Sequence, residues 1–441
     1  MENKSKTQIK KLGERIVKSS SNDEISEDDL HALQEYRVSF RDTIAKVFDI
    51  VYNSCHNINK QSIVTYRIKR IESIIDKLRR NGDMRLDRMI DIAGCRGILS
   101  NNEQVYKVLH QLQKNQKIKI VKIQDYIENP QPEGYKSLHI YVSLNDEEQK
   151  SVEIQLRSQA QHNWATLVEI TDFVYGTKLK ELHKPDDLLT FHRILSLDNE
   201  QITKQERTIF FDILEKRNYI NTINKTFVQN YISVREQWIN LQRKHQNSFY
   251  LIEAELGTTP RINSYSSFNE AEEAYFARFH SNSNANIVLT NIPHATYEQI
   301  SVAYSNYMLS THNFSDNCLE RYQEQIEFAL KNHNYLDYKR YYKQYFTILV
   351  YSVLLLQTEI NSYNVNTNKR GKNNINVKDW TKDLLNKINR INKKQEKLRY
   401  IYRKTLDRGK FFYYYCAIIT RVINRKCRKQ IEMQYKKGQI L

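Results

Sequence analysis

Two neighbouring segments, residues 137–144 and 151–158, alternate apolar and polar side chains at every second position. Because successive side chains of a β-strand point to opposite faces, each segment predicts a strand with one apolar and one polar face. A polar turn over 145–150 joins them. The apolar faces consist of Leu138, Ile140, Val142, Val152, Ile154 and Leu156. The pair therefore predicts a sheet that buries one face and presents the other.

The polar face of this pair carries side chains that can bind or react. On the second strand a carboxylate, an amide and a guanidinium follow one another, a row that is costly unless the groups meet solvent or a ligand. The polar residues of both strands are Ser137, His139, Tyr141, Glu153, Gln155 and Arg157. We therefore expect this face to meet solvent or to bind a polar ligand.

A second acidic residue, Asp91, stands near the start of the apolar run 90–99, which predicts a buried strand, and Arg96 lies further along it. If Asp91 and Glu153 converge, they form a site for Mg²⁺, which prefers one or two carboxylates together with water and nucleotide phosphates. Glu153 could instead act as a general base on an attacking hydroxyl. The alternative interpretation is that each acid pairs with an arginine at a solvent-facing end of the sheet.

A basic segment at 66–78, YRIKRIESIIDKL, lies within a run over 62–80 that predicts a single helix. On such a helix the cations fall on adjoining turns and could neutralise a triphosphate. They include Arg67, Lys69, Arg70 and Lys77. The alternative is an exposed amphipathic helix. Since the sequence has no glycine-rich phosphate loop of the G-x-x-x-x-G-K-[ST] type, we expect side chains and a metal to hold any phosphates.

Strand and helix signals alternate between about 90 and 175, which predicts an α/β domain with a mixed sheet flanked by helices. Helices are also expected over 27–55 and 297–304. The expected divisions are a flexible N-terminus (1–25), the sheet domain (26–180), a helical segment (181–248), a small α/β unit (249–312) and a basic, tyrosine-rich helical region (313–441).

The chain carries a formal charge of +17, and 30 of its 441 residues are tyrosine. This charge favours polyanionic partners such as nucleotides, RNA, DNA or an acidic membrane surface, although a solvated basic surface is the alternative. Basic residues interleave with tyrosines at 335–346 and 399–415, a pattern that suits phosphate contacts and base stacking on RNA. The alternative is that these tyrosines form a helical core. The terminal helices could also bind a membrane, an antitoxin or a phage protein.

The five cysteines are scattered and form no CxxC pair, which fits reduced thiols in the cytosol and offers no zinc site. The polar N-terminal stretch has no apolar core of a signal peptide. The longest apolar run, 345–356, is shorter than the roughly 20 residues that a membrane-spanning helix needs. We therefore expect a cytoplasmic protein without a membrane span.

Six segments, taken together and in this order, resemble the synthetase domain of the RelA/SpoT family. They are YRIKRIESIIDKL (66–78), RMIDIAGCRGIL (88–99), DYIENP (125–130), GYKSLH (134–139), VEIQLRS (152–158) and HNWATLVE (162–169). The resemblance spans about 30–180, a third of the chain. It implies a mixed sheet related to that of nucleotidyltransferases, and Mg²⁺-dependent transfer of the β,γ-pyrophosphate of ATP to the 3′-hydroxyl of GDP or GTP.

The resemblance also implies roles for individual residues. Asp91 corresponds to the metal-binding aspartate, and Glu153 to the catalytic glutamate that handles the metal or the proton of the 3′-hydroxyl. Arg67 corresponds to the arginine over the adenine of ATP. The remaining matches are Lys69, Lys77 and Arg96 at the ATP phosphates, Tyr135 stacked on the acceptor base, and His139, Gln155 and Arg157 on the acceptor or phosphate side.

The sequence departs from the family pattern near the acceptor pocket. Glu133 stands where the family usually has asparagine, and Gln131 where it often has lysine. Thr166 follows Ala165, as in short synthetases of the family rather than long ones. The sequence has no His-Asp dipeptide, so a hydrolase domain of the family type is not expected.

Three functions are therefore open. The first is a stand-alone synthetase that makes (p)ppGpp-type alarmones from ATP and GDP or GTP. The second is a toxic synthetase that pyrophosphorylates the 3′ CCA end of tRNA, as some family members do in toxin–antitoxin systems or phage defence. The third is a non-enzymatic nucleotide sensor or RNA-binding protein.

Overall fold

The computed structural model describes residues 5–19, 25–145, 147–177, 186–197, 201–223, 247–254, 261–281, 286–291, 312–368 and 410–436, with a few isolated positions between them. The chain forms two compact units, each described by itself. The first consists of Met1–Ile213 and Val234–Leu309, and the second of Leu214–Ser233 and Ser310–Leu441.

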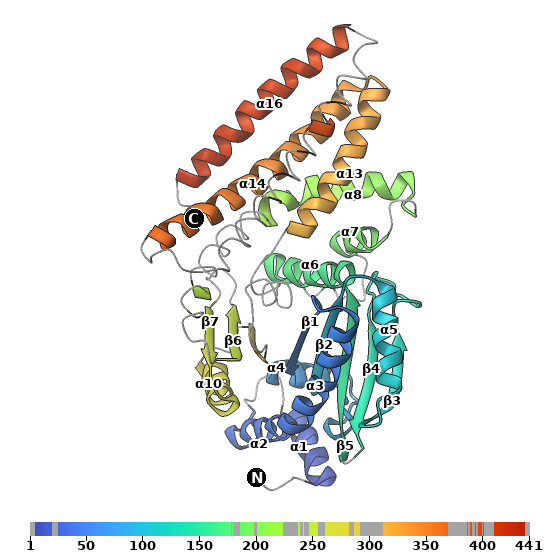
Figure 1. Cartoon of the computed structure of the whole chain (residues 1–441), viewed down its shortest axis with the longest axis vertical. Helices are drawn as coiled ribbons and strands as arrows, with labels where there is room; N and C mark the ends of the chain where they lie inside the picture. Colours follow the sequence, from blue (N-terminus) through green and yellow to red (C-terminus); the bar gives the residue numbers. More distant parts are fainter. Residues whose placement is uncertain are drawn as a thin grey trace. The chain divides into compact units, whose positions relative to one another are not determined.

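An eight-stranded mixed sheet with the order β3-β4-β5-β2-β1-β8-β6-β7 organises the first unit (Figure 1). Its strands are β1 (Ile63–Ile68), β2 (Ala93–Leu99), β3 (Ile118–Asp125), β4 (Leu138–Leu144), β5 (Glu147–Ser158), β6 (Phe249–Ala254), β7 (Arg261–Tyr265) and β8 (Asn286–Asn291). Strands β2 and β5 pair in parallel, whereas the other pairs are antiparallel. Because β8 pairs with β1 through Tyr66 and Asn291, the segment 249–291 continues the sheet begun before residue 160.

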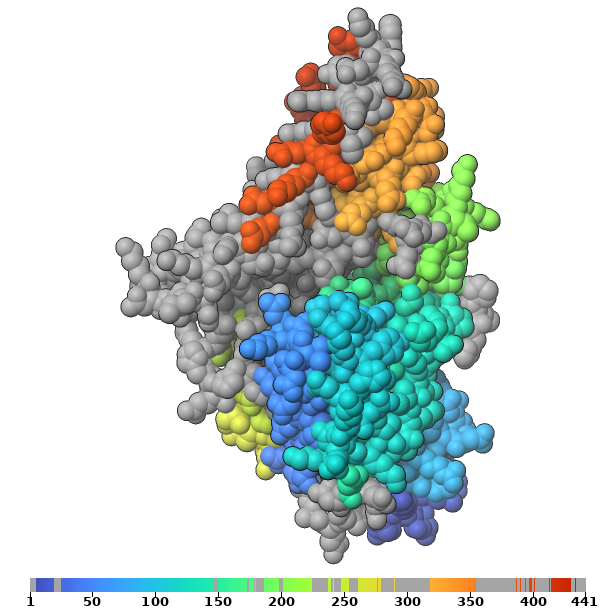
Figure 2. All heavy atoms as spheres, turned by 45° about the vertical axis from the view of Figure 1, so that its right-hand side comes forward, coloured from blue at the N-terminus to red at the C-terminus, as the bar shows by residue number. Residues whose placement is uncertain are grey.

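The first unit also contains helices. They are α1 (Lys6–Lys18), α2 (Glu27–Val38), α3 (Arg41–Ile58), α4 (Ile71–Arg80), α5 (Asn102–Gln113), α6 (Gln159–Tyr175), α7 (Asp187–Leu195) and α10 (Phe268–Ser281), with a 3₁₀ turn at Leu86–Arg88, and α8 (Lys204–Lys216) begins in this unit. Figure 2 shows α3 and α5, in blue and cyan, covering one side of the first unit. Both contact β2 and β5.

The alternating pattern of β4 and β5 places their apolar residues on this covered face, where Ile140, Ile154 and Leu156 are fully buried. Gly97 on β2 allows α3 to approach closely, because a Cβ there would lie 2.9 Å from Cys55 Sγ of that helix. The polar residues of β4 and β5 are consequently left on the opposite face of the sheet.

The second unit contains the helices α13 (His312–Lys331), α14 (Tyr335–Asn368) and α16 (Lys410–Lys436). Helices α14 and α16 pack together, with Tyr338 Oη 2.7 Å from Thr420 Oγ1 and Tyr342 Oη 3.1 Å from Asn424 Oδ1. Several tyrosines of the first basic stretch are buried, namely Tyr338, Tyr342 and Tyr345. These three belong to a helical core rather than to an exposed RNA-binding surface.

The structure corrects five predicted elements. Much of the N-terminus that was expected to be flexible forms α1 (Lys6–Lys18), which buries Leu12 and Ile16 in the core. The polar turn expected over 145–150 is shorter, because β5 begins at Glu147. The single helix expected over 62–80 is wrong, because residues 63–68 form β1 and the helix α4 begins at Ile71. The helix expected over 27–55 is interrupted at Ser39–Phe40. The strand expected from residue 90 begins at Ala93. The helix expected over 297–304 lies outside the described residues.

The predicted mixed α/β architecture is confirmed, as is the mostly helical C-terminal region. Strand β3 and helix α6 lie in the stretch 90–175 where strand and helix signals were expected to alternate. Strand β7 had no counterpart in the sequence analysis. Within the part of the chain that the structure describes, no helix is long and apolar enough to cross a membrane.

Candidate functional site

The polar face of the sheet is organised by the register of four strands. Gly94 of β2 is aligned with Arg67 of β1 and with Glu153 of β5, and Tyr141 of β4 is aligned with Glu153. Because aligned residues of neighbouring strands point to the same face, Arg67, Glu153 and Tyr141 share one face. Gly94 has no side chain, which leaves space between Arg67 and Glu153. A second aligned row consists of Thr65, Arg96, Gln155 and His139.

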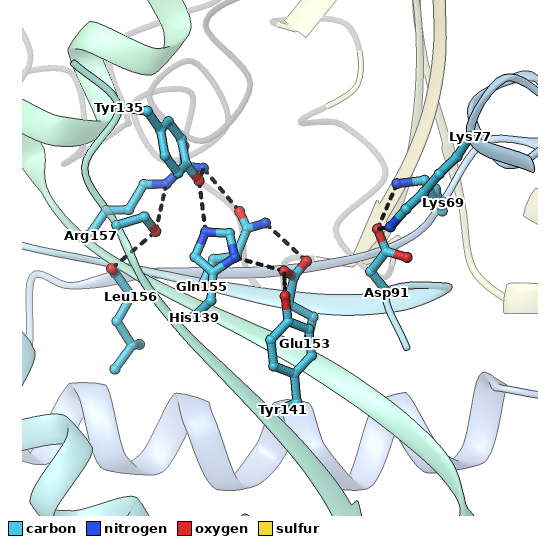
Figure 3. A network of polar contacts seen from close by, with 11 residues as sticks. Lys69, Lys77, Asp91, Tyr135, His139, Tyr141, Glu153, Gln155, Leu156 and Arg157 are labelled. Carbon is cyan, nitrogen blue, oxygen red and sulfur yellow. Dashed lines mark hydrogen bonds and ion pairs between the residues drawn. The ribbon is translucent and has the colours of Figure 1, made fainter. Parts of the chain in front are cut away.

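Glu153 is held by three neighbours on this face (Figure 3). His139 Nδ1 lies 2.8 Å from its Oε1 atom, and Tyr141 donates a hydrogen bond of 3.1 Å to the same oxygen. Gln155 Nε2 donates to Oε2 at 3.0 Å. Both oxygens are therefore oriented by neighbouring strands, which places the carboxylate before any substrate arrives.

The same neighbours set the charge of Glu153. Burial would raise the pKa of its carboxyl, but the hydrogen bond and charge of His139 outweigh burial and lower the pKa below its ordinary value. Burial would likewise lower the pKa of His139, yet the hydrogen bond with Glu153 raises it. At neutral pH the carboxylate is therefore ionised and can accept a hydrogen bond or a proton, or bind a cation.

A tyrosine and an arginine extend this network away from Glu153. Tyr135 Oη lies 2.8 Å from His139 Nε2, and Arg157 donates to the same hydroxyl at 2.6 Å. The guanidinium of Arg157 also lies over the Tyr135 ring, 5.1 Å from its centroid. Tyr135 follows a turn at Gly134, whose φ of +97° favours glycine. The result is a flat aromatic ring fixed beside a cation.

Asp91 lies in the connection between the 3₁₀ turn and β2, and two lysines converge on it. Lys69 Nζ is 2.9 Å and Lys77 Nζ 2.8 Å from Asp91 Oδ2. Burial would raise the pKa of Asp91, but the two ammonium groups lower it below its ordinary value. Its second oxygen, Oδ1, is buried and has no hydrogen-bond partner among the described residues. Asp91 therefore has one oxygen available for a cation.

Asp91 lies two residues before β2, whose Gly94 is aligned with Glu153 of β5, so the two carboxylates lie at the same part of the sheet. Figure 3 draws Asp91 with its two lysines in the same close view as the Glu153 network, and the charge of Asp91 acts to raise the pKa of Glu153. The described residues contain no cluster of three or more histidine, cysteine, aspartate or glutamate side chains suited to a metal. A cation here would therefore need oxygens from a ligand or from water to complete its shell.

All ten residues singled out from the sequence lie around this face, although their roles remain predictions. Lys69 and Lys77 meet at Asp91, and the acceptor-side residues form a chain with Glu153. The helical stripe proposed for the basic segment is wrong, because Arg67 lies on β1 and Lys77 on α4. The two ends of this segment still face one site, since the chain turns between them.

Sequence reasoning missed two contributing residues. Tyr141 was placed on the polar face but was not assigned to the site, although it donates to Glu153. Arg37 of α2 was not noticed at all. The available signal was weak: Arg37 follows Leu33 by one helical turn and so lies on the apolar side of the helix, where the structure leaves it only 1% exposed.

Comparisons with known proteins match this part of the chain. A family model described as "Region found in RelA / SpoT proteins" covers residues 66–178. The chain is 34% identical over 157 residues to the GTP pyrophosphokinase YwaC of Bacillus subtilis, a match that covers 32% of this chain and 74% of that protein. It is 30% identical over 125 residues to the GTP pyrophosphokinase YjbM of the same species, covering 27% and 59%.

Solved structures were matched as well. Small alarmone synthetase 1 from Bacillus subtilis, bound to its product pppGpp, is 22% identical, with a TM-score of 0.33. The match covers 43% of this chain and 97% of that one. Small alarmone synthetase 2 from the same species is 25% identical, with a TM-score of 0.31 and coverage of 43% and 99%. The family model spans every candidate residue from Arg67 to Arg157.

Proposed function

This chain belongs to the RelA/SpoT family of pyrophosphokinases, and from that premise we propose that it transfers the β,γ-pyrophosphate of ATP to the 3′-hydroxyl of GDP or GTP, forming a (p)ppGpp-type alarmone. The observation that carries the proposal is the pair of carboxylates. Glu153 is oriented by three neighbours, and Asp91 faces two lysines while keeping one buried oxygen without a hydrogen bond.

The ATP side of the site consists of cations from two elements. Lys69 and Lys77, which pair with Asp91, would exchange part of this pairing for the phosphates of ATP. Arg67 and Arg96 lie in the two aligned rows beside Gly94 and can reach the same face. Planar guanidinium groups suit both phosphate binding and stacking on adenine. This set neutralises the charge of a triphosphate without a glycine-rich loop.

The acceptor side is the Tyr135 end of the network. The ring of Tyr135 can stack on a base, while Arg157 and Gln155 line the path from that ring to Glu153. His139 bridges Tyr135 and Glu153 and thereby fixes the distance from the base site to the catalytic carboxylate. An acceptor bound here would present its ribose near Glu153.

The donor set fits Mg²⁺. Asp91 Oδ1 offers a buried oxygen without a hydrogen bond, and Glu153 supplies a second carboxylate on the neighbouring strand. Oxygen ligands of this kind, completed by phosphates and water, suit Mg²⁺. When bound, the ion would neutralise charge that develops on the transferred group. Asp91 and Glu153 are the residues that would hold it.

The reaction requires the 3′-oxygen to attack the β-phosphorus of ATP. A bond forms between these two atoms, the bond from the β-phosphorus to the α,β-bridging oxygen breaks, and AMP leaves. Glu153 accepts the proton of the 3′-hydroxyl or orients that hydroxyl. Lys69 and Lys77 stabilise negative charge on the phosphates, so the protein contributes mainly placement and charge neutralisation.

An assay of several acceptors in parallel tests the proposed identity of the acceptor. The full chain, Mg²⁺ and ATP labelled at the γ-phosphate should be offered GDP, GTP, ATP and deacylated tRNA in parallel. We expect label on the guanine nucleotides, together with stoichiometric AMP. Label on tRNA with none on GDP or GTP would contradict the alarmone proposal.

Tyr135 gives a more specific test of the acceptor side. We predict that Tyr135→Ala raises the KM for the acceptor by roughly tenfold or more, the value of a lost base stack, while ATP binding changes little. Tyr135→Phe keeps the ring and serves as the matched control, with a smaller effect on KM. Equal losses of ATP and acceptor binding in Tyr135→Ala would instead indicate a structural tyrosine.

A second candidate function, pyrophosphorylation of the tRNA 3′ end, is favoured by one face of α16. Opposite the buried Cys416, Ile423 and Cys427, this helix exposes aromatic, aliphatic and cationic side chains together. The exposed residues between 414 and 429 are Tyr414, Tyr415, Ile418, Arg421, Val422, Arg425, Lys426, Arg428 and Lys429. Such a combination suits phosphate contacts and base stacking.

This candidate predicts that Arg421→Glu/Arg425→Glu weakens tRNA binding and labelling and leaves GDP use unchanged. Lys11→Glu/Lys18→Glu is the matched control, because it changes the net charge equally at exposed positions of α1. Equal behaviour of the two double variants in a tRNA titration would exclude a specific role for α16.

The non-enzymatic alternative predicts no transfer to any acceptor despite nucleotide binding, and the same parallel assay tests it. A cytoplasmic location, and an antitoxin or phage protein as partner, stay predictions from the sequence.

A further inference from the structure

Arg37 of helix α2 is a cation in the core of the first unit. Only 1% of its surface is exposed, and a buried charge is costly unless its partners are well placed. Its Nε donates a 2.8 Å hydrogen bond to the carbonyl of Lys69, and its Nη1 donates to Gln34 Oε1. Its guanidinium lies 4.6 Å from the centroid of the Tyr275 ring. These contacts fix Arg37 between the candidate site and α10.

Helix α10 contacts both Arg37 and its neighbour Gln34. Gln34 Nε2, next to Arg37, donates a 2.7 Å hydrogen bond to Glu272 Oε2. Glu272 and Tyr275 are both buried on α10. Arg41 at the start of α3 also contacts α10, because its guanidinium lies over the ring of Phe268. The segment 249–291 thus reaches the N-terminal helices through buried polar contacts as well as through the sheet.

Lys69 links Arg37 to the candidate site. Its backbone N–H donates to the carbonyl of Ile92 at 2.7 Å, and its own carbonyl accepts from Arg37. Its side chain reaches Asp91 Oδ2 at 2.9 Å. Because Ile92 directly follows Asp91, the peptide groups around Lys69 are fixed on one side to the metal-binding candidate and on the other to Arg37.

We propose that Arg37 is a positioning residue for the ATP-phosphate side of the site, and that α10 holds it in place through Glu272 and Tyr275. The proposal rests on the function proposed above, because it assumes that Lys69 binds ATP phosphates. It assigns α10 a part in ATP binding, although none of the site contacts described above involves a residue of that helix. A change in how α10 contacts Arg37 would therefore alter ATP affinity.

Tyr275 provides a matched pair of variants. Tyr275→Leu removes the ring under Arg37, whereas Tyr275→Phe removes only a hydroxyl that is buried without a hydrogen-bond partner among the described residues. Binding of the α,β-methylene analogue of ATP with Mg²⁺ should be measured by calorimetry for the full chain and both variants. We expect Tyr275→Leu to weaken binding about tenfold, the usual size of an effect on a supporting residue, and Tyr275→Phe to match the wild type.

Kinetics separates positioning from a general loss of structure. In Tyr275→Leu the KM for ATP should rise, while kcat at saturating ATP and the KM for the acceptor stay within about twofold, since the acceptor side lies elsewhere on the sheet. Arg37→Lys should show the same split, because lysine keeps the charge but cannot make the paired contacts. A lower melting temperature with unchanged analogue binding would mean that these residues only stabilise the fold.

The outcomes also separate this proposal from the proposed function. If the wild-type chain does not bind the ATP analogue, the pyrophosphokinase assignment fails. If it binds the analogue and Tyr275→Leu binds it equally well, the assignment stands and the positioning role of Arg37 is overturned.

Discussion

At the scale of single residues, the site depends on neighbours that fix a charge in place. The side chain of Glu153 is only 13% exposed, and a carboxylate so largely shielded from water would by itself tend to be neutral. The contact with His139 and the hydrogen bond from Tyr141 keep it ionised, and the hydrogen bond from Gln155 helps to limit its rotation. Lys69 and Lys77 likewise keep Asp91 ionised. Each acid is thus held in the charged form that can bind a cation.

We predict that Asp91→Asn and Glu153→Gln each reduce pyrophosphate transfer at least about 100-fold, because each removes a charge that the reaction needs. The folded state should persist in both, as judged by far-UV circular dichroism and a cooperative melt. Asp87→Asn is the control. The carboxylate of Asp87 pairs with Arg85 at a distance of 2.6 Å and is not one of the candidate site residues, so transfer should be retained. Substantial turnover in either active-site variant would contradict the assignment.

At the scale of elements, β4 and residues 151–158 of β5 could be predicted from the sequence because local pattern and tertiary environment agree there. Leu138, Ile140 and Ile154 alternate with polar residues and are buried. The same agreement brought His139, Glu153 and Gln155 to one face.

The segment 62–80 misled the sequence analysis because two signals overlap in it. Its cations recur at helical spacing, yet Ile63, Val64 and Thr65 are β-branched and lie in β1. Pairing with β2 on one side and β8 on the other decides the outcome, and neither partner is close in sequence. The contact between Arg37 and Lys69 was unpredictable for the same reason, since it depends on where distant helices pack.

A prediction at this scale concerns Gly97 of β2. Gly97→Ala should lower the free energy of unfolding by about 1–3 kcal/mol, because the added Cβ would lie 2.9 Å from both Cys55 Sγ and Leu156 Cδ2. Gly82→Ala is the matched control, since a Cβ there meets nothing within 4 Å. Urea denaturation of both variants measures the difference, and equal stabilities would show that α3 can move away from the sheet.

At the scale of the first unit, residues from the two ends of the sheet share one hydrophobic core. Leu251, Phe268 and Leu289 belong to the same buried cluster as Val51 of α3 and Ile154 of β5. A sheet assembled from segments so far apart in sequence should unfold as one cooperative structure. The described elements β6, β7, α10 and β8 are thus part of the first unit rather than an appendage to it.

This shared core leads to a prediction about Leu251. Leu251→Ala should destabilise the fold by about 2–5 kcal/mol, because Leu251 is completely buried in that core. Pyrophosphate transfer should be lost at the temperature where the chain melts, in a single transition. Glu273→Ala on the exposed side of α10 should change neither quantity. If Leu251→Ala melted in two steps, with activity surviving the first, the segment would be an independent domain.

The position of β8 beside β1 has a consequence for synthesis in the cell. While a ribosome is making this chain, β1 has β2 as a neighbour but lacks β8 until Asn291 has been translated. At ordinary elongation rates roughly ten seconds separate that moment from completion of the last motif of the family match. For most of this interval, until Tyr275 has been made, Arg37 has no aromatic ring beneath it, so a nascent chain would carry the candidate site residues before the proposed support for ATP binding is in place.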